Sequence, residues 1–319
     1  MLKRSDMMKV NILSPVHRGG PYNWASDLVF MLNKKGIKAK WIHNLKNILI
    51  SLFYQDADVI HTVVPLTYRL WVKPVVLTVK GDYTIEKRKW RLLYPLAIKK
   101  ADIVTTPSHF LKQRLNLDDA VVIPNAIFPD RFKIVKHFEK EIINLVTVTN
   151  FGFRDKAEGV LNIVKILEKV KKSTDKKINY TIIGGGAYLE QIKEKTKEYD
   201  TNVKFTGFLN DPKEVLETSD IFVYYSIHDN FPNSILDGMA SGLPVITNNV
   251  GAVPEIIESE RDGYVAEYDE DYQEYFLNLV EDYKLREKIG QNARKTVEEK
   301  FDWKKVVNEY ISIYENLMP

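Results

Sequence analysis

The sequence predicts an α/β protein of two doubly wound, Rossmann-like domains, each built around a parallel sheet. The chain has 319 residues, of which 45% are hydrophobic, enough to bury two cores of ordinary size. Apolar strand-like runs alternate with amphipathic helical stretches along both halves, and this alternation is typical of parallel sheets. The alternation stops between Pro124 and Lys140, where a proline-flanked loop leads into a charged stretch. We therefore expect domains at 1–135 and 136–300, followed by a C-terminal helix at 301–319.

The first half contains six short apolar runs with helical stretches between most of them. The runs are rich in Val and Ile, as strands in a sheet usually are. The expected strands are 9–13, 39–42, 58–61, 75–79, 102–105 and 120–123, and the expected helices are 22–35, 45–54, 86–100 and 108–115.

A glycine-containing loop, His17-Arg-Gly-Gly20, joins the first strand to the first helix. Glycines let a backbone approach a ligand closely, so Gly19 and Gly20 are candidate ligand-binding residues. The loop does not have the Gly-x-Gly-x-x-Gly spacing of a dinucleotide site. A plain tight turn explains it equally well, and both interpretations stay open.

The helix expected from Glu86 to Lys100 alternates basic and apolar positions. Such a helix suits an anionic surface, although a solvated helix face is the more common explanation. Charge is unevenly divided along the chain. Residues 1–140 contain 24 Lys and Arg and 11 Asp and Glu, whereas residues 141–319 contain 22 and 32. The first half therefore favours an anionic partner.

The second half repeats the alternation of strands and helices. The expected strands are 142–149, 178–183, 203–206, 221–225 and 245–247, and the expected helices are 159–172, one ending at 197, one starting at 211, 234–241, 271–283, 285–300 and 302–314. Polar or glycine-containing segments follow several of these strands. In parallel sheets, ligands bind beyond the carboxyl ends of the strands. Lys156, Phe208 and Asp229 are therefore expected to line one cleft.

Two carboxylates eight residues apart, Asp229 and Asp237, bracket a loop that enters a helix. The start of a helix offers unpaired backbone N–H groups beside a positive dipole end, which suits phosphate. Carboxylates accept hydrogen bonds from hydroxyls, so the combination predicts a polyhydroxylated, phosphorylated ligand. The alternative is that Ser234 caps an ordinary helix with a surface Asp on either side.

Composition excludes several classes of protein and site. The chain has no cysteine, which excludes disulfides, thiolate metal sites and a cysteine nucleophile. Its six histidines lack paired spacing, so a histidine metal site is not expected. The stretch from Met1 to Met8 does not resemble a secretory leader, and no apolar run approaches the roughly 20 residues of a membrane span. We expect a cytoplasmic protein, either soluble or at the inner face of the membrane.

Three segments in the second half occur in the order and spacing of a known family. The segments 242–247, 251–255 and 262–264 resemble the C-terminal signature of the family-4 retaining glycosyltransferases, which belong to the glycosyl transferases group 1 and have the GT-B fold. Residues 58–61, 101–108, 122–125 and 301–303 are similar to other parts of that family. The resemblance covers nearly the whole chain, although the region between Gly20 and His61 is shorter than usual.

The resemblance implies two Rossmann-like domains facing a central cleft, with the C-terminal helix packing back toward the N-terminal domain. The C-terminal domain would hold a nucleotide-sugar donor, with a UDP- or GDP-sugar expected, and the N-terminal domain would hold the acceptor. No cofactor is expected, and the sequence lacks the Asp-x-Asp metal signature of other glycosyltransferases.

The resemblance also implies roles for individual residues. Asp229 and Asp237 stand at a pair of glutamates that contact the sugar hydroxyls and the ribose. Gly207 and Phe208 stand where the base is received. The stretch Phe231-Pro232-Asn233-Ser234 would offer backbone N–H groups to the sugar and diphosphate.

Cations in the family contact the diphosphate, and here the match is partial. Lys156 fits one position of the basic pair, whereas Asn150 replaces its arginine and Arg154 is the nearest substitute. Lys80 stands where many relatives have histidine, and a cation there suits a phosphate on the acceptor.

Cleavage of the sugar–phosphate bond leaves negative charge on the diphosphate, which Lys156 and backbone N–H groups would stabilise. The resemblance implies retention of configuration without a protein nucleophile, and transfer of a hexose-like sugar to a glycan, glycolipid or polyprenyl-phosphate-linked acceptor. The departures at Asn150 and Lys80 leave open a degenerate, non-catalytic nucleotide-sugar-binding or scaffold protein. A GT-B epimerase is a weaker alternative, and nucleic-acid binding is not expected because no recognition motif accompanies the basic charge.

Overall fold

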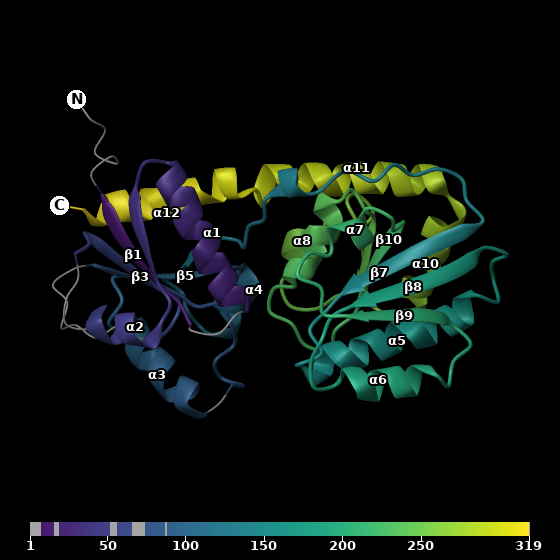
Figure 1. Ribbon diagram of the computed structural model, residues 1–319, viewed down its shortest axis with the longest axis horizontal. Helices are drawn as coiled ribbons and strands as arrows, with labels where there is room; N and C mark the ends of the chain where they lie inside the picture. Colours follow the sequence, from purple (N-terminus) through teal and green to yellow (C-terminus); the bar gives the residue numbers. More distant parts are fainter. Residues whose placement is uncertain (1–7, 16–18, 52–55, 66–73, 87, 319) are drawn as a thin grey trace. The chain divides into compact units, whose positions relative to one another are not determined.

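The structure is a computed structural model and describes residues 8–15, 19–51, 56–65, 74–86 and 88–318 (Figure 1). The chain divides into two compact units. Unit 1 consists of Met1–Ala126 and Phe301–Pro319, and unit 2 consists of Ile127–Lys300. The predicted fold class is confirmed, because each unit contains a six-stranded sheet in which the paired strands run parallel.

Unit 1 has the strand order β2-β1-β3-β4-β5-β6. Its strands are β1 (Lys9–Leu13), β2 (Lys38–Ile42), β3 (Val59–Thr62), β4 (Val75–Thr78), β5 (Ile103–Thr106) and β6 (Val121–Val122). Its helices are α1 (Gly20–Lys34), α2 (Leu45–Ser51), α3 (Arg88–Ile98), α4 (His109–Arg114) and α12 (Trp303–Leu317). Residues 52–55, the end of the helix expected at 45–54, and residues 1–7 lie outside the described residues.

Two helical layers cover the sheet of unit 1. On one face α1 packs against α12, while α2, α3 and α4 cover the other face (Figure 1). Side chains of a strand alternate between faces, so His61 and Thr78 point toward α1 and α12. His61 Nδ1 lies 2.6 Å from the Tyr314 hydroxyl of α12, and its Nε2 lies 2.6 Å from Thr78 Oγ1.

The C-terminal helix α12 packs through one face. Asp302 accepts a hydrogen bond from Lys304 N at 2.8 Å and caps the helix. The side chains that recur at helical spacing are buried: Trp303, Val306, Val307, Tyr310 and Tyr314.

Unit 2 has the strand order β12-β11-β10-β7-β8-β9. Its strands are β7 (Ile142–Val148), β8 (Lys177–Ile183), β9 (Asn202–Gly207), β10 (Ile221–Tyr224), β11 (Val245–Asn248) and β12 (Tyr264–Ala266). Its helices are η2 (Pro129–Arg131), α5 (Arg154–Val170), α6 (Leu189–Thr196), α7 (Lys213–Leu216), α8 (Asn233–Ala240), α9 (Val253–Ile256), α10 (Asp269–Glu281) and α11 (Tyr283–Lys300).

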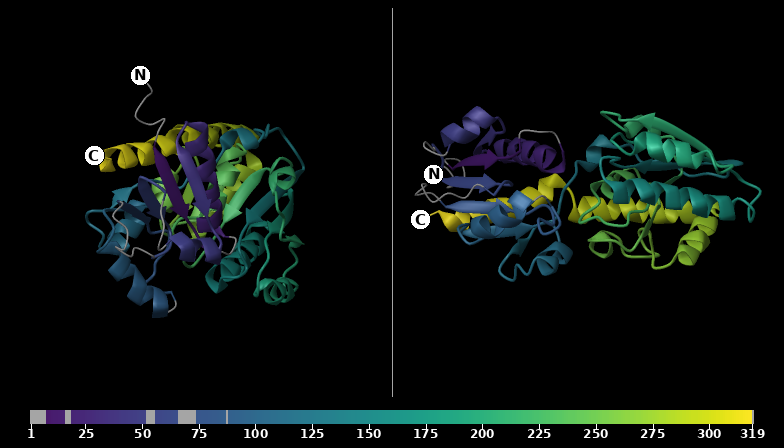
Figure 2. Two further views of the ribbon diagram at one scale, coloured as in Figure 1. Left: turned by 60° about the vertical axis from the view of Figure 1, so that its left-hand side comes forward. Right: turned by 90° about the horizontal axis from the view of Figure 1, so that it is seen from below.

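Helices flank both faces of the sheet in unit 2 (Figure 2). Apolar side chains of α5 and α10 form a buried core with the sheet, and α6 packs beside α5. Helices α8 and α11 pack against each other, and α8 also contacts β10 and β11. Gly238 permits a close approach of α8, because a Cβ atom there would lie 2.6 Å from the Phe222 ring of β10.

Several elements differ from the expectations. Arg154 and Lys156 were expected in a loop, but they occupy the first turn of α5, where Asp155 complements the positive end of the helix dipole. The short elements α9 and β12 were not predicted, because β12 has only three residues and depends on pairing with β11.

The segment from Ile127 to residue 135 belongs to unit 2, although the domain boundary was placed at residue 135. Arg294 of α11 holds this segment, because its Nη1 donates to Pro129 O at 2.8 Å and to Phe132 O at 3.1 Å. Within the described ranges, no helix is both long and apolar enough to cross a membrane.

Candidate functional site

The candidate site of unit 2 lies at the carboxyl ends of β7 and β10. These strands are neighbours, yet β8 and β9 lie between them in the sequence. The order therefore reverses between β7 and β10, and ligands of doubly wound sheets bind at such a switch point. The segment after β7 leads into α5, and the segment after β10 leads into α8.

Lys156 and Asp229 meet at this switch point. Lys156 Nζ lies 2.6 Å from Asp229 Oδ2, and the two side chains are only 23% and 9% exposed. The Tyr224 hydroxyl donates to the same oxygen at 2.5 Å, while Asn230 N donates to Asp229 Oδ1 at 2.8 Å. Both carboxylate oxygens therefore have donors, and the ammonium group of Lys156 is held in place.

A glycine on α5 makes this ion pair possible. A Cβ atom at Gly159 would lie 1.9 Å from the backbone oxygen of Tyr225, so only glycine allows α5 to approach the end of β10 so closely. This contact brings the first turn of α5, with Lys156, beside the loop that contains Asp229. Gly159 was not predicted as a site residue, because its contact with Tyr225 joins segments distant in sequence. Tyr224 was not predicted either, because the sequence shows it only as the end of an apolar strand.

A second glycine fixes the loop of Asp229. Gly251 has φ +58°, and a Cβ atom there would lie 2.1 Å from Asp229 O. The next residue, Ala252, donates its N–H to Asn230 O at 3.0 Å. The segment 251–255, recognised in the sequence as part of a family signature, thus supports the site loop and begins α9.

Helix α8 begins at Asn233 without a side-chain cap. Its N-cap is Pro232, so the alternative in which Ser234 caps the helix is wrong. The cause is local: proline lacks an N–H group and has a restricted φ, and it therefore takes the position just before the helix. The first N–H groups of α8, from Asn233 and Ser234, follow directly after the loop of Phe231 and Pro232.

Asp237 lies one turn further along α8 and is half-buried. Burial raises the pKa of its carboxyl to about 7; the charge of Arg131 opposes this shift and that of Asp211 adds to it. Among the residues that the structure describes, no hydrogen bond or ion pair reaches this carboxylate. Asp229 and Asp237 therefore differ, since the first is paired within the protein and the second has no such partner among the described residues.

The loops after β7, β8 and β9 are joined by backbone hydrogen bonds. Phe151 N donates to Gly185 O at 3.1 Å, and Gly184 N donates to Gly207 O at 2.9 Å. Phe208, directly after β9, is 73% exposed at this edge of the sheet. An exposed aromatic ring beside glycine backbone offers a flat apolar surface to a ligand.

Asn150 and Arg154 have other partners. Asn150 Oδ1 accepts a hydrogen bond from Gly152 N at 2.8 Å and closes its own turn. Arg154 Nε contacts Glu158 Oε1 at 2.7 Å, one turn along α5, and its side chain is 71% exposed. The structure thus brings Lys156 to Asp229 and leaves Arg154 in solvent.

In unit 1, Lys80 follows β4 on the face covered by α1. Its Nζ lies 4.2 Å from the centre of the Trp24 ring and 2.6 Å from Asn125 Oδ1. Burial lowers the pKa of Lys80 well below its usual value. The nearby carboxylate of Asp82 is bound instead to Arg114 Nε at 3.0 Å. Gly19 is the N-cap of α1 and Gly20 its first residue; residues 16–18 of the same loop lie outside the described residues.

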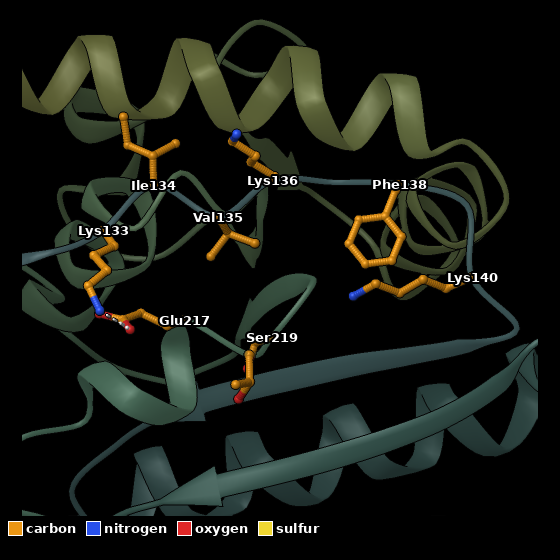
Figure 3. Close-up of a pocket in the computed structure, with 9 residues that line it drawn as sticks. Lys133, Ile134, Val135, Lys136, Phe138, Lys140, Glu217 and Ser219 are labelled. Atoms are coloured by element: carbon orange, nitrogen blue, oxygen red, sulfur yellow. Dashed lines mark hydrogen bonds and ion pairs between the residues drawn. The ribbon is translucent and has the colours of Figure 1, made fainter.

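A hollow of about 420 Å³ elsewhere in unit 2 contains none of the predicted site residues (Figure 3). Its wall is formed by the segment from Lys133 to Lys140 and by Glu217, Thr218 and Ser219. Lys133 Nζ pairs with Glu217 Oε2 at 3.2 Å. Since this side of unit 2 is remote in the fold from the carboxyl ends of the strands, the hollow is separate from the candidate site.

Proteins with related sequences include one that is named a glycosyltransferase and one that is named a synthase. The chain is 27% identical over 253 residues to an uncharacterized glycosyltransferase of Methanocaldococcus jannaschii, covering 75% of this chain and 64% of that protein. It is 26% identical over 246 residues to N-acetyl-alpha-D-glucosaminyl L-malate synthase of Bacillus anthracis, covering 71% and 62%. The matches thus span less than two thirds of each relative.

Solved structures share the fold of the whole chain. A sucrose-phosphate synthase from Thermosynechococcus elongatus has a TM-score of 0.81 and 15% identity, covering 97% of this chain and 99% of that one. HepE of Anabaena, solved in complex with UDP-glucose, has a TM-score of 0.78 and 14% identity, covering 97% and 100%.

A family match covers about half of the chain and includes the whole candidate site of unit 2. The family described as Glycosyl transferases group 1 matches residues 134–296, from the segment before β7 into α11. This protein therefore belongs to the glycosyl transferases group 1 family.

Proposed function

We propose that the protein is a retaining glycosyltransferase that moves a sugar from a nucleotide-sugar to an acceptor hydroxyl. The observation that carries this proposal is the Lys156–Asp229 pair at the switch point of unit 2, next to the uncapped start of α8. A cation, backbone N–H groups and carboxylates within one loop system match the charges and hydroxyls of a sugar diphosphate.

In this proposal, different residues of unit 2 bind different parts of the donor. Phe208 and Gly207 receive the base, and Asp237 accepts a hydrogen bond from the ribose. The N–H groups of Asn233 and Ser234 face the diphosphate, and Asp229 orients the sugar. That relatives of known structure were solved with UDP-glucose supports a UDP-sugar as the first donor to test.

Lys156 acts on the leaving group. As the bond between sugar and phosphate breaks, negative charge grows on the diphosphate, and the ammonium group stabilises it more strongly than it stabilises the intact donor. Tyr224 holds Asp229, and Asp229 holds Lys156, before the donor arrives, so little reorganisation is needed. Neither a protein nucleophile nor a metal takes part in the proposed step.

Unit 1 is proposed to hold the acceptor. Lys80 is fixed by Trp24 and Asn125, and no carboxylate in the described part of the chain is paired with it. Burial lowers the pKa of Lys80, and an anionic group beside it would favour its charged form. Lys80 therefore favours an acceptor with a phosphate or carboxylate group, such as a phosphate-linked lipid or glycan.

The test is donor hydrolysis without an acceptor. We expect one sugar of a UDP- and GDP-sugar panel to raise the melting temperature and to be hydrolysed slowly. Lys156→Ala should lower this rate by at least about 100-fold, since one donor to a developing oxyanion contributes this much. Lys165→Ala, on the exposed face of the same helix, should leave the rate unchanged.

Unchanged turnover in Lys156→Ala would remove that residue from the mechanism. Tight binding of a nucleotide-sugar without hydrolysis or transfer across a broad acceptor panel would instead favour a non-catalytic binding protein.

A further inference from the structure

Helix α3 of unit 1 presents an apolar stripe to solvent. Leu92 is 61% exposed and Leu96 is 59% exposed, and Ile85, in the turn before the helix, is 58% exposed. Leu92 and Leu96 are one helical turn apart, so they lie on the same face of α3. Large aliphatic side chains clustered on one exposed face are unusual in a surface helix and mark an interaction surface.

The opposite face of α3 is anchored in the core of unit 1. Ala97 is buried, and Trp90, Tyr94 and Ile98 pack against the cluster that contains Leu77 and Val79 of the sheet. The Tyr94 ring stacks on the Tyr83 ring with centroids 5.0 Å apart. The helix is therefore held in one orientation, with Leu92 and Leu96 on its outer face. Helix α3 lies on the side of unit 1 away from α1 and α12 (Figure 1).

Cations surround the stripe. Arg88, Lys89, Arg91, Lys99 and Lys100 are all exposed. On a helix of 3.6 residues per turn Arg88 and Arg91 lie on one side of the two leucines and Lys89 on the other, and Lys99 and Lys100 follow directly after the end of α3. Glu86 is the one carboxylate between residues 83 and 101. Among the described residues, none of these five cations is ion-paired with a carboxylate; Lys89 Nζ lies 4.5 Å from the centre of the Trp90 ring.

We propose that Leu92 and Leu96 of α3, together with the exposed Ile85 of the preceding turn and the five neighbouring cations, dock on an anionic phospholipid surface. Leucine side chains at this position can enter the boundary between headgroups and acyl chains, while arginine and lysine reach the phosphates. A charged groove of a nucleic acid would not bury three exposed aliphatic side chains in an apolar environment. The apolar and cationic groups together fit a negatively charged lipid surface best.

This inference goes beyond the proposed function and stands on different residues. It concerns where the protein works, and its five cations are part of the excess of basic residues in the first half of the chain. An acceptor that carries a lipid would be presented at such a surface. Vesicle binding needs no nucleotide-sugar, so a failure of one proposal leaves the other unaffected.

The test is co-sedimentation of the full chain with vesicles. We expect binding to vesicles that contain phosphatidylglycerol, little binding to pure phosphatidylcholine, and a steep loss of binding as salt rises. Leu92→Ser combined with Leu96→Ser should weaken binding by at least about 10-fold, because the apolar contribution is lost. Lys99→Gln combined with Lys100→Gln should weaken binding and reduce its dependence on salt.

Phe30→Ser is the matched apolar control. Phe30 is 57% exposed on α1, which covers the other face of the sheet, and its replacement should leave vesicle binding unchanged. Because the substituted leucines and lysines are exposed, the circular dichroism and melting temperature of these variants should match those of the wild type.

Three outcomes would overturn the proposal: no binding to anionic vesicles, equal binding to neutral ones, or unchanged binding by the Leu92/Leu96 variant. A wild type that ignores vesicles but self-associates through the leucines would assign the stripe to a second copy of the chain instead.

Discussion

The coupling between Lys156 and Asp229 can be measured without knowing any substrate. We propose a double-mutant cycle of Lys156→Met, Asp229→Asn and the combination of both. Each substitution removes a charge and keeps approximately the shape of the side chain. Lys156→Met alone leaves the Asp229 carboxylate, 9% exposed, with only Tyr224 and Asn230 as donors.

The expected coupling follows from the geometry. At the Nζ–Oδ2 distance of 2.6 Å, Coulomb's law gives about 6 kcal/mol for an effective dielectric constant of about 20, and about 1.6 kcal/mol in water. Lys156 is 23% exposed, so solvent screens part of the interaction, and both groups lose hydration when they pair. We expect a coupling of about 2 kcal/mol.

The assay is chemical unfolding followed by two signals. All five tryptophans belong to unit 1, so tryptophan fluorescence reports on that unit alone. Far-UV circular dichroism reports on both units, and the transition absent from fluorescence belongs to unit 2. The variants should change only this second transition. Lys165→Met, on the exposed face of α5, is the control for loss of one positive charge.

A coupling below about 0.5 kcal/mol would refute the reasoning, because that is the value of an exposed ion pair. So would an equal effect of Lys165→Met. Either result would mean that Lys156 is not held in position before a ligand binds and is not preorganised for the leaving group.

Two further predictions concern pH. Burial and the charge of Lys80 lower the pKa of His61 to about 3. Between about pH 3 and 6.5 the unfolded chain therefore binds one more proton than the native state. The unfolding free energy of unit 1 should rise with pH across this window and level off above it. His61→Gln should flatten that rise in tryptophan fluorescence experiments, and an unchanged slope would contradict the assignment. The pKa of Asp237 is raised to about 7, so its carboxyl group holds the proton more tightly in the native state than in the unfolded state. Ionisation of Asp237 therefore lowers the unfolding free energy of unit 2 as pH rises from about 4 to 7. Asp237→Asn should therefore be more stable than the wild type at pH 8 by roughly 1–3 kcal/mol, with little difference at pH 4; exposed Asp118→Asn is the control, and a difference independent of pH would contradict the prediction.

Most of the fold was predictable because local patterns specify it. Apolar runs and amphipathic stretches alternate, and the structure has strands and helices at nearly all of these positions. The prediction failed where an element depends on its neighbours. Three-residue β12 exists because β11 provides its hydrogen-bonding partner, and α5 starts five residues before the expected position because its first turn packs against the segment after β10.

The candidate site was predictable as a set of loops but not as a set of contacts. The position of Lys156, Phe208 and Asp229 directly after strands indicated that they share one edge of the sheet. The roles of these residues in catalysis and binding stay predictions. The contacts of these residues depend on the order of the strands in the sheet, and local sequence patterns do not specify that order.

By itself, the sequence determined that this chain forms two parallel-sheet units with polar loops at their carboxyl ends, because periodicity and glycine spacing act over a few residues. Only the tertiary structure decided which loops meet. Lys156 and Asp229 pair because β7 and β10 are adjacent and Gly159 lets α5 approach closely. Tyr314 reaches His61 because α12 packs beside α1. Burial then sets the pKa of His61 and Asp237, since it depends on every element packed around them.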